Sequence, residues 1–216
     1  MFSTSEENYI KAIYHLQRKG ETVSTNALSD RIQTKPASVT DMLKKLKAKK
    51  ILEYKPYHGV SLTAHGRKVA LDIVRRHRLW EFFLVHSLGF EWDAVHEIAE
   101  ELEHIQHPEL VDKLDAFLGR PAFDPHGDPI PDRHGIMANI EYKLLTDAQS
   151  GDKVRFLSVG LQTPELMTML KHKKISLGDS IEVIEKFEFD QSLDVLVNGD
   201  RQVSLSYRTA RHMLVN

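Results

Sequence analysis

The chain has 216 residues, of which 41% are hydrophobic and 28% are charged, and its formal net charge is −2. This composition is typical of a globular protein, and the length allows one large domain or two to three small ones. There are no cysteines, which excludes disulfides and thiolate metal ligands. No apolar run approaches the length of a membrane span, and the first residues lack the basic-then-apolar order of a secretory signal, so we expect a cytoplasmic protein.

The N-terminal segment is predicted to form three helices and a β-hairpin. Apolar spacing predicts helices over residues 5–18, about 24–32 and about 36–50, and Pro36 suits the first turn of the third helix. Over residues 51–63 the apolar pattern changes to the alternation typical of strands, which predicts two strands joined by a turn. This order of elements is that of a winged helix-turn-helix, in which the second and third helices form the DNA-reading unit.

The third predicted helix carries the candidate DNA contacts. Hydroxyl side chains lie near its N-terminal end, where a recognition helix reaches bases or phosphates, and lysines follow. The candidate DNA-binding residues are Lys35, Pro36, Ser38, Thr40, Lys44 and Lys45. Winged helices also serve as protein–protein modules, and lysine-rich helix ends are common, but the whole order of elements favours DNA binding.

The middle of the chain is predicted to be helical and is acidic. Helices are predicted over about 64–88, about 91–106 and from Pro108 to about 118. Residues 119–135 are rich in proline and glycine, which predicts a loop and a domain boundary. A basic first part beside an acidic centre indicates nucleic acid at one end and cations in the middle.

The helix predicted over residues 91–106 is the most informative stretch. At 100° per residue, four side chains fall within one arc of about 100° beside its apolar face. These side chains are His96, Glu100, Glu103 and His104. Crowded carboxylates repel one another unless a cation lies between them, and nitrogen plus oxygen ligands suit Mn, Fe, Co, Ni or Zn better than Ca or Mg. The alternative is an ordinary solvated charged face.

Other candidate metal ligands lie elsewhere in the chain. His77 and Glu81 are four residues apart on the preceding predicted helix and therefore share a face, which is a common two-ligand unit. Further potential ligands are Glu7, Asn8, Asp124 and His126. Taken singly, each of these is more typical of a cap, a turn or a surface residue.

The C-terminal part of the chain is mostly strand-like. Alternating patterns over residues 153–157, 180–184, 193–197 and 202–205 predict strands, and residues 163–172 predict one short helix. Several short strands within about seventy residues favour a small barrel.

Together these motifs resemble the diphtheria-toxin-repressor family of metal-dependent transcription factors, including its manganese-regulator branch and the three-domain streptococcal-type manganese repressors. The resemblance covers nearly the whole chain, and the His-x3-Glu and Glu-x2-Glu-His units in this order are highly specific. The matching stretches are residues 7–14, 35–43, 62–66, 77–81, 95–104 and 125–131.

The resemblance implies a multidomain, mainly α fold with β in three domains. A winged helix-turn-helix would cover residues 1–63, a helical metal-binding and dimerisation domain 64–140, and an SH3-like, FeoA-type barrel 141–216. It also implies a homodimeric repressor, not an enzyme and not a membrane protein, that binds a palindromic operator in double-stranded DNA and controls genes for divalent metal uptake.

Carried over by position, the resemblance also implies two metal sites. The ancillary site would use His77, Glu81, His96 and Glu165, with Gln162 as the alternative to Glu165. The regulatory site would use Asn8, Glu100, Glu103, His104 and Asp124.

Four positions determine how closely the chain follows the branches of this family. Asn8 stands where the manganese branch has Asp and the iron branch Met, and Lys11 stands where two-domain manganese regulators have Glu, which argues against their binuclear arrangement here. Glu100 follows the manganese branch, and Asp124 replaces a Cys ligand of streptococcal-type relatives. Oxygen and imidazole ligands favour Mn(II), with Fe(II) as the alternative.

Two other functions stay open from the sequence. One is a winged-helix regulator that responds to a small molecule. In such a protein the four side chains His96, Glu100, Glu103 and His104 form an ordinary solvent-exposed face. The other is a metalloenzyme, although the chain contains no HExxH, nucleophile-elbow or P-loop motif.

Overall fold

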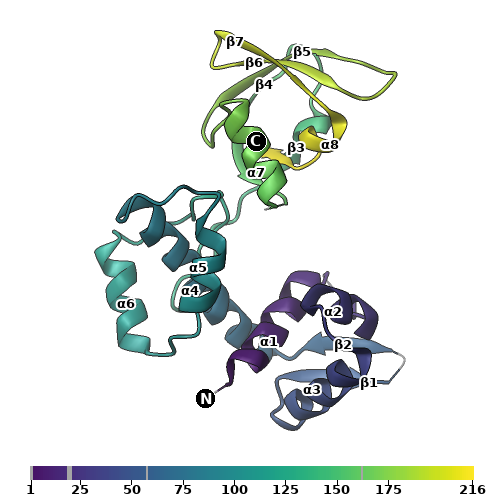
Figure 1. Ribbon diagram of the computed structural model, residues 1–216, viewed down its shortest axis with the longest axis vertical. Helices are drawn as coiled ribbons and strands as arrows, with labels where there is room; N and C mark the ends of the chain where they lie inside the picture. The colour runs from purple at the N-terminus through teal and green to yellow at the C-terminus, as the bar shows by residue number, and fades with distance from the viewer. Residues whose placement is uncertain (1, 19–20, 57, 162) are drawn as a thin grey trace. The chain divides into compact units, whose positions relative to one another are not determined.

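A computed structural model describes residues 2–18, 21–56, 58–161 and 163–216. The chain forms two compact units, whose elements are labelled in Figure 1. The N-terminal unit comprises Met1–Trp80, Glu97–Arg120 and Ile130–Met137. The C-terminal unit comprises Glu81–His96, Pro121–Pro129 and Ala138–Asn216.

The predicted winged helix-turn-helix is confirmed in the N-terminal unit. Ser3 and Glu6 form a capping box at the start of the first helix, because each side chain bonds the backbone N–H of the other residue. The two strands pair antiparallel, with Leu52 opposite Leu62. The elements are α1 (Thr4–Leu16), α2 (Thr25–Ile32), α3 (Pro36–Ala48), β1 (Leu52–Lys55) and β2 (Gly59–Leu62).

Apolar side chains from these helices and from the hairpin form the core of the N-terminal unit. Fully buried members are Ile10, Ile13, Leu28, Val39, Leu43, Leu46, Ile51, Leu52 and Val60. The next helix packs closely on this core at Gly66, where an added Cβ would lie 1.9 Å from the Ile51 carbonyl oxygen. Only glycine allows that approach without a backbone shift.

The central helices differ from prediction at one important place. They are α4 (Ala64–His86), α5 (Val95–Leu102) and α6 (Pro108–Phe117). The helix predicted over residues 91–106 is therefore wrong at both ends, and Glu103 and His104 lie in the turn that follows α5. After α5 the Ile105 N–H bonds the Leu102 carbonyl, an i→i−3 bond in place of the helical i→i−4 bond, and Arg76 Nε donates to the Glu103 carbonyl at 2.6 Å. Pro108 also has no N–H to donate to the His104 carbonyl.

The C-terminal unit contains a six-stranded antiparallel sheet in the order β3-β8-β4-β5-β6-β7. Its strands are β3 (Lys143–Leu144), β4 (Lys153–Val159), β5 (Ser180–Lys186), β6 (Leu193–Val197), β7 (Arg201–Leu205) and β8 (Met213–Val215). Figure 1 shows α7 (Pro164–His172) and α8 (Tyr207–Ala210) on one side of the curved sheet. Phe156, Leu170 and Ile181 are buried between them. The four predicted strands and the predicted helix are present, whereas β3, β8 and α8 are too short to show a period.

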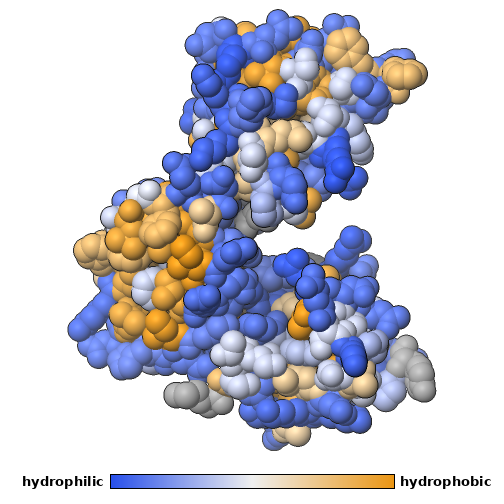
Figure 2. Space-filling view, viewed as in Figure 1, coloured by the Kyte–Doolittle hydropathy of each residue, from blue (hydrophilic) through white to orange (hydrophobic). Residues whose placement is uncertain are grey.

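Hydrophobic side chains gather on the surface of the central helices, as Figure 2 shows. Within the N-terminal unit the exposed large apolar residues include Ile105, Leu110, Phe117 and Ile136, and Phe117 is 72% exposed. An exposed apolar surface of this kind is typical of an interaction face. Among the described residues, no helix has the length and apolar character required to cross a membrane.

Candidate metal centres

Carboxylate and imidazole side chains cluster inside each unit. In the N-terminal unit, ligand atoms of His77, Glu100 and Glu103 lie within 4.8 Å of one another. In the C-terminal unit, those of Glu81, Asp124 and His126 do the same, and all three residues are buried. We call these the Glu103 group and the Glu81 group.

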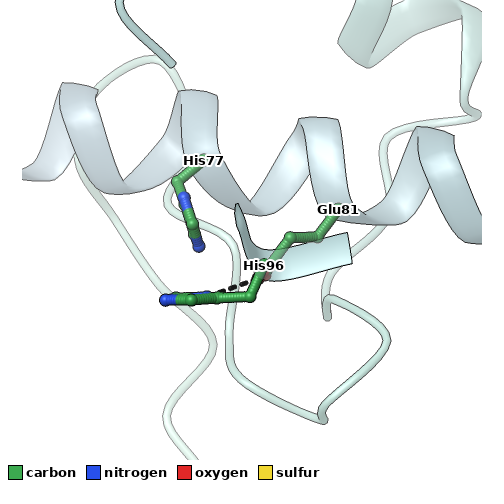
Figure 3. A group of neighbouring side chains, drawn as sticks. All are labelled: His77, Glu81 and His96. Atoms are coloured by element: carbon green, nitrogen blue, oxygen red, sulfur yellow. Dashed lines mark hydrogen bonds and ion pairs between the residues drawn. The ribbon is translucent and has the colours of Figure 1, made fainter. Parts of the chain in front are cut away.

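Two of the predicted ancillary residues, His77 and Glu81, lie where α4 passes from one unit to the other. Figure 3 shows His77 and Glu81 on the same face of α4, one turn apart. His96, at the start of α5, contacts Glu81 with its Nδ1 3.1 Å from Oε1. The four-residue spacing therefore places the two α4 side chains on one face, as predicted.

Glu103 is the centre of the Glu103 group and is completely buried. Its Oε2 lies 2.7 Å from His77 Nδ1 and 2.7 Å from Lys11 Nζ. Its Oε1 has no hydrogen bond among the described residues and faces His104 Nε2 at 3.9 Å. Lys11 Nζ also lies 2.6 Å from Glu100 Oε1. A buried carboxylate with an unsatisfied oxygen is costly, so this position favours a cation.

The imidazole of His104 is oriented by a carboxylate behind it. His104 Nδ1 lies 2.6 Å from Glu7 Oε2, and the other oxygen of Glu7 bonds Arg76 Nη2 at 2.6 Å. His104 Nε2 is thereby left facing Glu103, which is the arrangement that metal-binding histidines use. Asn8 Oδ1 is also buried without a hydrogen bond among the described residues. These oxygen and imidazole donors fit a divalent metal ion.

The Glu81 group is built on a tight turn. Asp124 Oδ1 accepts the N–H groups of His126 at 2.8 Å and Asp128 at 3.0 Å. Gly127 has φ +83°, and an added Cβ there would lie 1.9 Å from the Leu157 carbonyl oxygen, so the turn requires glycine. Close packing of this turn holds the Asp124 carboxylate and the His126 imidazole in place.

His126 is also held by its ring nitrogens. Its Nε2 lies 2.9 Å from the Trp92 carbonyl oxygen, and its Nδ1 lies 3.5 Å from Glu81 Oε2. Burial lowers the pKa of His126, but the contact with Glu81 and the negative charges of Glu81 and Asp124 outweigh burial and raise this pKa to about 9. Without metal, His126 therefore carries a proton at neutral pH, and that proton must leave before Nδ1 can bind a metal ion.

The remaining predicted ligands are Asp124, Glu165 and Gln162, and the outcome differs for each of them. Asp124 lies with Glu81 and His126 inside the C-terminal unit, whereas the resemblance assigns it to the regulatory site. Glu165 is exposed in the first turn of α7 and belongs to neither group. Gln162 lies outside the described residues.

Four residues that the structure brings to these groups have no assigned site role from the sequence: Glu7, Lys11 and Arg76 around the Glu103 group, and His126 within the Glu81 group. Glu7 and His126 are potential ligands there, but only singly, and Lys11 is only a departure from a family pattern. Arg76 gives no signal in the sequence. One feature of the sequence could have indicated that His126 belongs to a site: it lies two residues after Asp124 and directly before a glycine.

The candidate DNA-binding residues lie on the outer face of α3 and just before it. Lys35, Pro36, Ser38, Lys44 and Lys45 are exposed. Thr40 is half-buried, and its hydroxyl donates to the Pro36 carbonyl at 3.1 Å.

Glu6 joins α1 to α3. This buried carboxylate lies 2.7 Å from Lys49 Nζ and 3.1 Å from Lys45 Nζ. Burial raises the pKa of Glu6, but hydrogen bonds from Lys49, from the Ser3 N–H and from Lys45 outweigh burial and lower this pKa to about 2. Glu6 is therefore ionised at neutral pH and contributes to stability in that form.

Replacing Glu6 with glutamine is expected to lower the free energy of unfolding at neutral pH by about 2 kcal/mol, because charge-assisted hydrogen bonds are lost. The folded pKa lies below the unfolded value of 4.5, so this contribution is present above pH 4.5 and disappears as the pH falls toward 2. Urea unfolding should show the gap between wild type and Glu6→Gln shrink at pH 3. Glu53→Gln, at an exposed position in β1, is the control, and a pH-independent gap for Glu6→Gln would contradict the account.

Comparison with known proteins defines the family. The models of the iron dependent repressor N-terminal DNA binding domain, the iron dependent repressor metal binding and dimerisation domain, and the FeoA domain match residues 1–60, 63–132 and 143–216. The iron-dependent repressor IdeR of Mycobacterium leprae (strain TN) is 28% identical over 224 residues, covering 97% of this chain and 95% of that protein.

Two solved structures are similar over almost their whole length. A manganese-dependent transcriptional repressor in complex with manganese is 33% identical, with a TM-score of 0.90, and the match covers 98% of this chain and 99% of that one. ScaR with bound Zn2+ is 31% identical, with a TM-score of 0.79 and 98% of each chain covered.

The fold and the matches define a DNA-binding regulator with an N-terminal DNA-binding domain, a helical dimerisation domain and a C-terminal FeoA domain. The chain belongs to the iron-dependent repressor family, whose members are metal-dependent transcriptional repressors and not enzymes. The predicted fold class and family are therefore confirmed, and the family's effector is a divalent metal ion.

Proposed function

We propose that this protein is a homodimeric cytoplasmic repressor that binds a palindromic operator when divalent metal is bound, and that it controls genes for metal uptake. The observation that carries this proposal is the pair of buried carboxylate–imidazole groups around Glu103 and Glu81 in a chain that begins with a winged helix. Buried carboxylates gathered in this way favour a bound cation.

Each of the two proposed metal sites uses residues of one unit. The Glu103 site comprises Asn8, His77, Glu100, Glu103 and His104. We assign His77 to this site because its Nδ1 lies 2.7 Å from Glu103 Oε2, whereas the resemblance assigns it to the ancillary site with Glu81 and His96. The Glu81 site comprises Glu81, His96, Asp124 and His126. Glu165 stays a prediction for the Glu81 site.

We infer that Mn(II) is the physiological metal, with Fe(II) as the alternative. The proposed ligands are oxygen and imidazole atoms, and the chain has no cysteine to favour softer metals. The similar manganese-dependent repressor was solved with manganese, whereas the relative from Mycobacterium leprae is an iron-dependent repressor. The ligand set favours manganese between these two.

Helix α1 connects the Glu103 site to the reading helix. Asn8 lies on α1 and Glu103 follows α5, so shared coordination of one ion holds these two segments together. Glu6, on the same first turns of α1, pairs with Lys45 of α3 and with Lys49, which directly follows α3. A bound ion thus restricts the position of α3 and removes an ordering cost from operator binding.

Dimerisation is supported by the exposed apolar surface that includes Ile105, Leu110 and Phe117. A closed dimer buries the same patch on both copies, and a two-fold dimer presents two α3 helices to two half-sites. The operator is therefore proposed to be a palindrome.

Titration calorimetry of the metal-stripped full-length protein with Mn(II), Fe(II), Co(II) and Zn(II) tests this proposal. We expect two Mn(II) ions per chain and a melting temperature that rises with Mn(II) concentration, because ligand binding to the folded state stabilises it. A regulator of the small-molecule type would show neither effect. Absence of Mn(II) and Fe(II) binding would refute the proposal.

A further inference from the structure

Lys11 places an ammonium group between the two carboxylates of the Glu103 site. Its Nζ lies 2.6 Å from Glu100 Oε1 and 2.7 Å from Glu103 Oε2. Lys11 belongs to α1, and its two partners are 89 and 92 residues further along the chain. The contact is therefore a tertiary feature of the N-terminal unit.

This ion pair differs from a surface salt bridge, which contributes little to stability. The side chain of Glu103 is 0% exposed and that of Lys11 is 12% exposed. A carboxylate buried so completely requires a compensating positive charge, because its hydration is lost. In the metal-free chain Lys11 supplies a full positive charge at this position, next to the imidazole of His77.

We propose that Lys11 is an internal counter-cation that competes with the metal ion for Glu103 and Glu100, and so sets the metal concentration at which the protein responds. This inference rests on the proposed function of the Glu103 site. An ammonium group and a divalent ion on the same carboxylate oxygen would lie close together in a poorly hydrated site and repel each other. Lys11 must therefore release Glu103 Oε2 when that oxygen binds metal.

Competition by Lys11 has two consequences for the metal response. The metal-free fold is stabilised, because the ammonium group of Lys11 offsets part of the negative charge of Glu100 and Glu103 without metal. Metal affinity is lower than the ligand set alone would give, because each binding event displaces an existing ion pair. Lys11 thus raises the concentration threshold without being a metal ligand itself.

The test measures Mn(II) binding by titration calorimetry to metal-stripped, full-length wild type, Lys11→Met and Lys11→Arg. Methionine keeps the length and apolar packing of the lysine stem but removes the charge. We expect Lys11→Met to bind Mn(II) at least about tenfold more tightly, equivalent to about 1.4 kcal/mol at 25 °C. Lys11→Arg keeps the charge, so its affinity should stay within about threefold of wild type.

A second readout is the melting temperature of the same proteins. Without metal, Lys11→Met should melt below wild type, because two crowded carboxylates lose their counter-charge. Saturating Mn(II) should close this gap. Lys113→Met, at an exposed position in α6, is the matched control for removal of a lysine charge, and it should change neither quantity.

The outcomes separate this inference from the proposed function. If wild type binds Mn(II) and Lys11→Met binds it no more tightly, Lys11 is not a competitor and the inference is overturned. If neither protein binds Mn(II) or Fe(II), the proposed function fails, and the inference fails with it. Should Lys11→Met not fold without metal, Lys11→Gln provides the neutral side chain for the same comparison.

Discussion

Replacing Glu103 with glutamine is expected to lower Mn(II) affinity by at least about 100-fold and to abolish metal-dependent operator binding. Glutamine keeps the shape of the side chain but removes the negative charge that faces Lys11, His77 and His104. Loss of a charged ligand from a buried site removes most of the electrostatic attraction for a divalent ion. Titration calorimetry with Mn(II) measures this loss directly.

The matched control is Glu101→Gln, on the exposed face of α5 two residues earlier. Both variants lose one carboxylate from the same acidic stretch, so a general effect of negative charge would lower the Mn(II) affinity of both equally. We expect wild-type Mn(II) affinity for Glu101→Gln. If Glu103→Gln also binds Mn(II) with wild-type affinity, Glu103 is not a metal ligand.

Replacing Arg76 with methionine is expected to lower the free energy of unfolding by about 3–5 kcal/mol, because one partner of a buried ion pair is removed. Arg76 is buried and donates at 2.6 Å to Glu7, to Asp72 and to the carbonyl of Glu103. In this variant the buried Glu7 carboxylate loses Arg76 and keeps its contact with His104. Thermal melting should show a fall of roughly 10 °C for a chain of this size.

The control for Arg76 is Arg133→Met, which removes an exposed arginine from the same unit. Surface substitutions usually change stability by less than about 0.5 kcal/mol. The Arg76 variant is also expected to weaken Mn(II) binding, since Glu7 orients His104. A melting temperature equal to that of Arg133→Met would show that the buried pair is not important for stability.

Local sequence patterns predicted the order of the elements well. Apolar spacing located the three helices and hairpin of the winged domain and the longer strands of the C-terminal sheet, because burial of one face leaves a period in the sequence. The end of α5 was predicted wrongly, because the local apolar spacing continues to Ile105, whereas Glu103 and His104 lie in a turn with non-local contacts, such as the bond of the Glu103 carbonyl to Arg76, 27 residues earlier. A contact of that kind leaves no trace in local periodicity.

The candidate sites were predictable only in part, for the same reason. The spacing of His77 and Glu81 placed both on one helix face, which the structure shows (Figure 3). The association of Glu81 with His126 depends on a turn that packs against β4 at Gly127. Lys11 between Glu100 and Glu103 is equally non-local. Such charged partners become visible only when the chain is folded.

Operator binding with and without metal tests the central claim most directly. A duplex enriched from a random-sequence DNA library by the Mn(II)-loaded protein serves as the probe, and fluorescence anisotropy measures its affinity. We predict a two-fold symmetric enriched sequence, and at least about a 100-fold loss of affinity after chelation that added Mn(II) reverses. Equal affinity for this duplex before and after chelation would contradict the account.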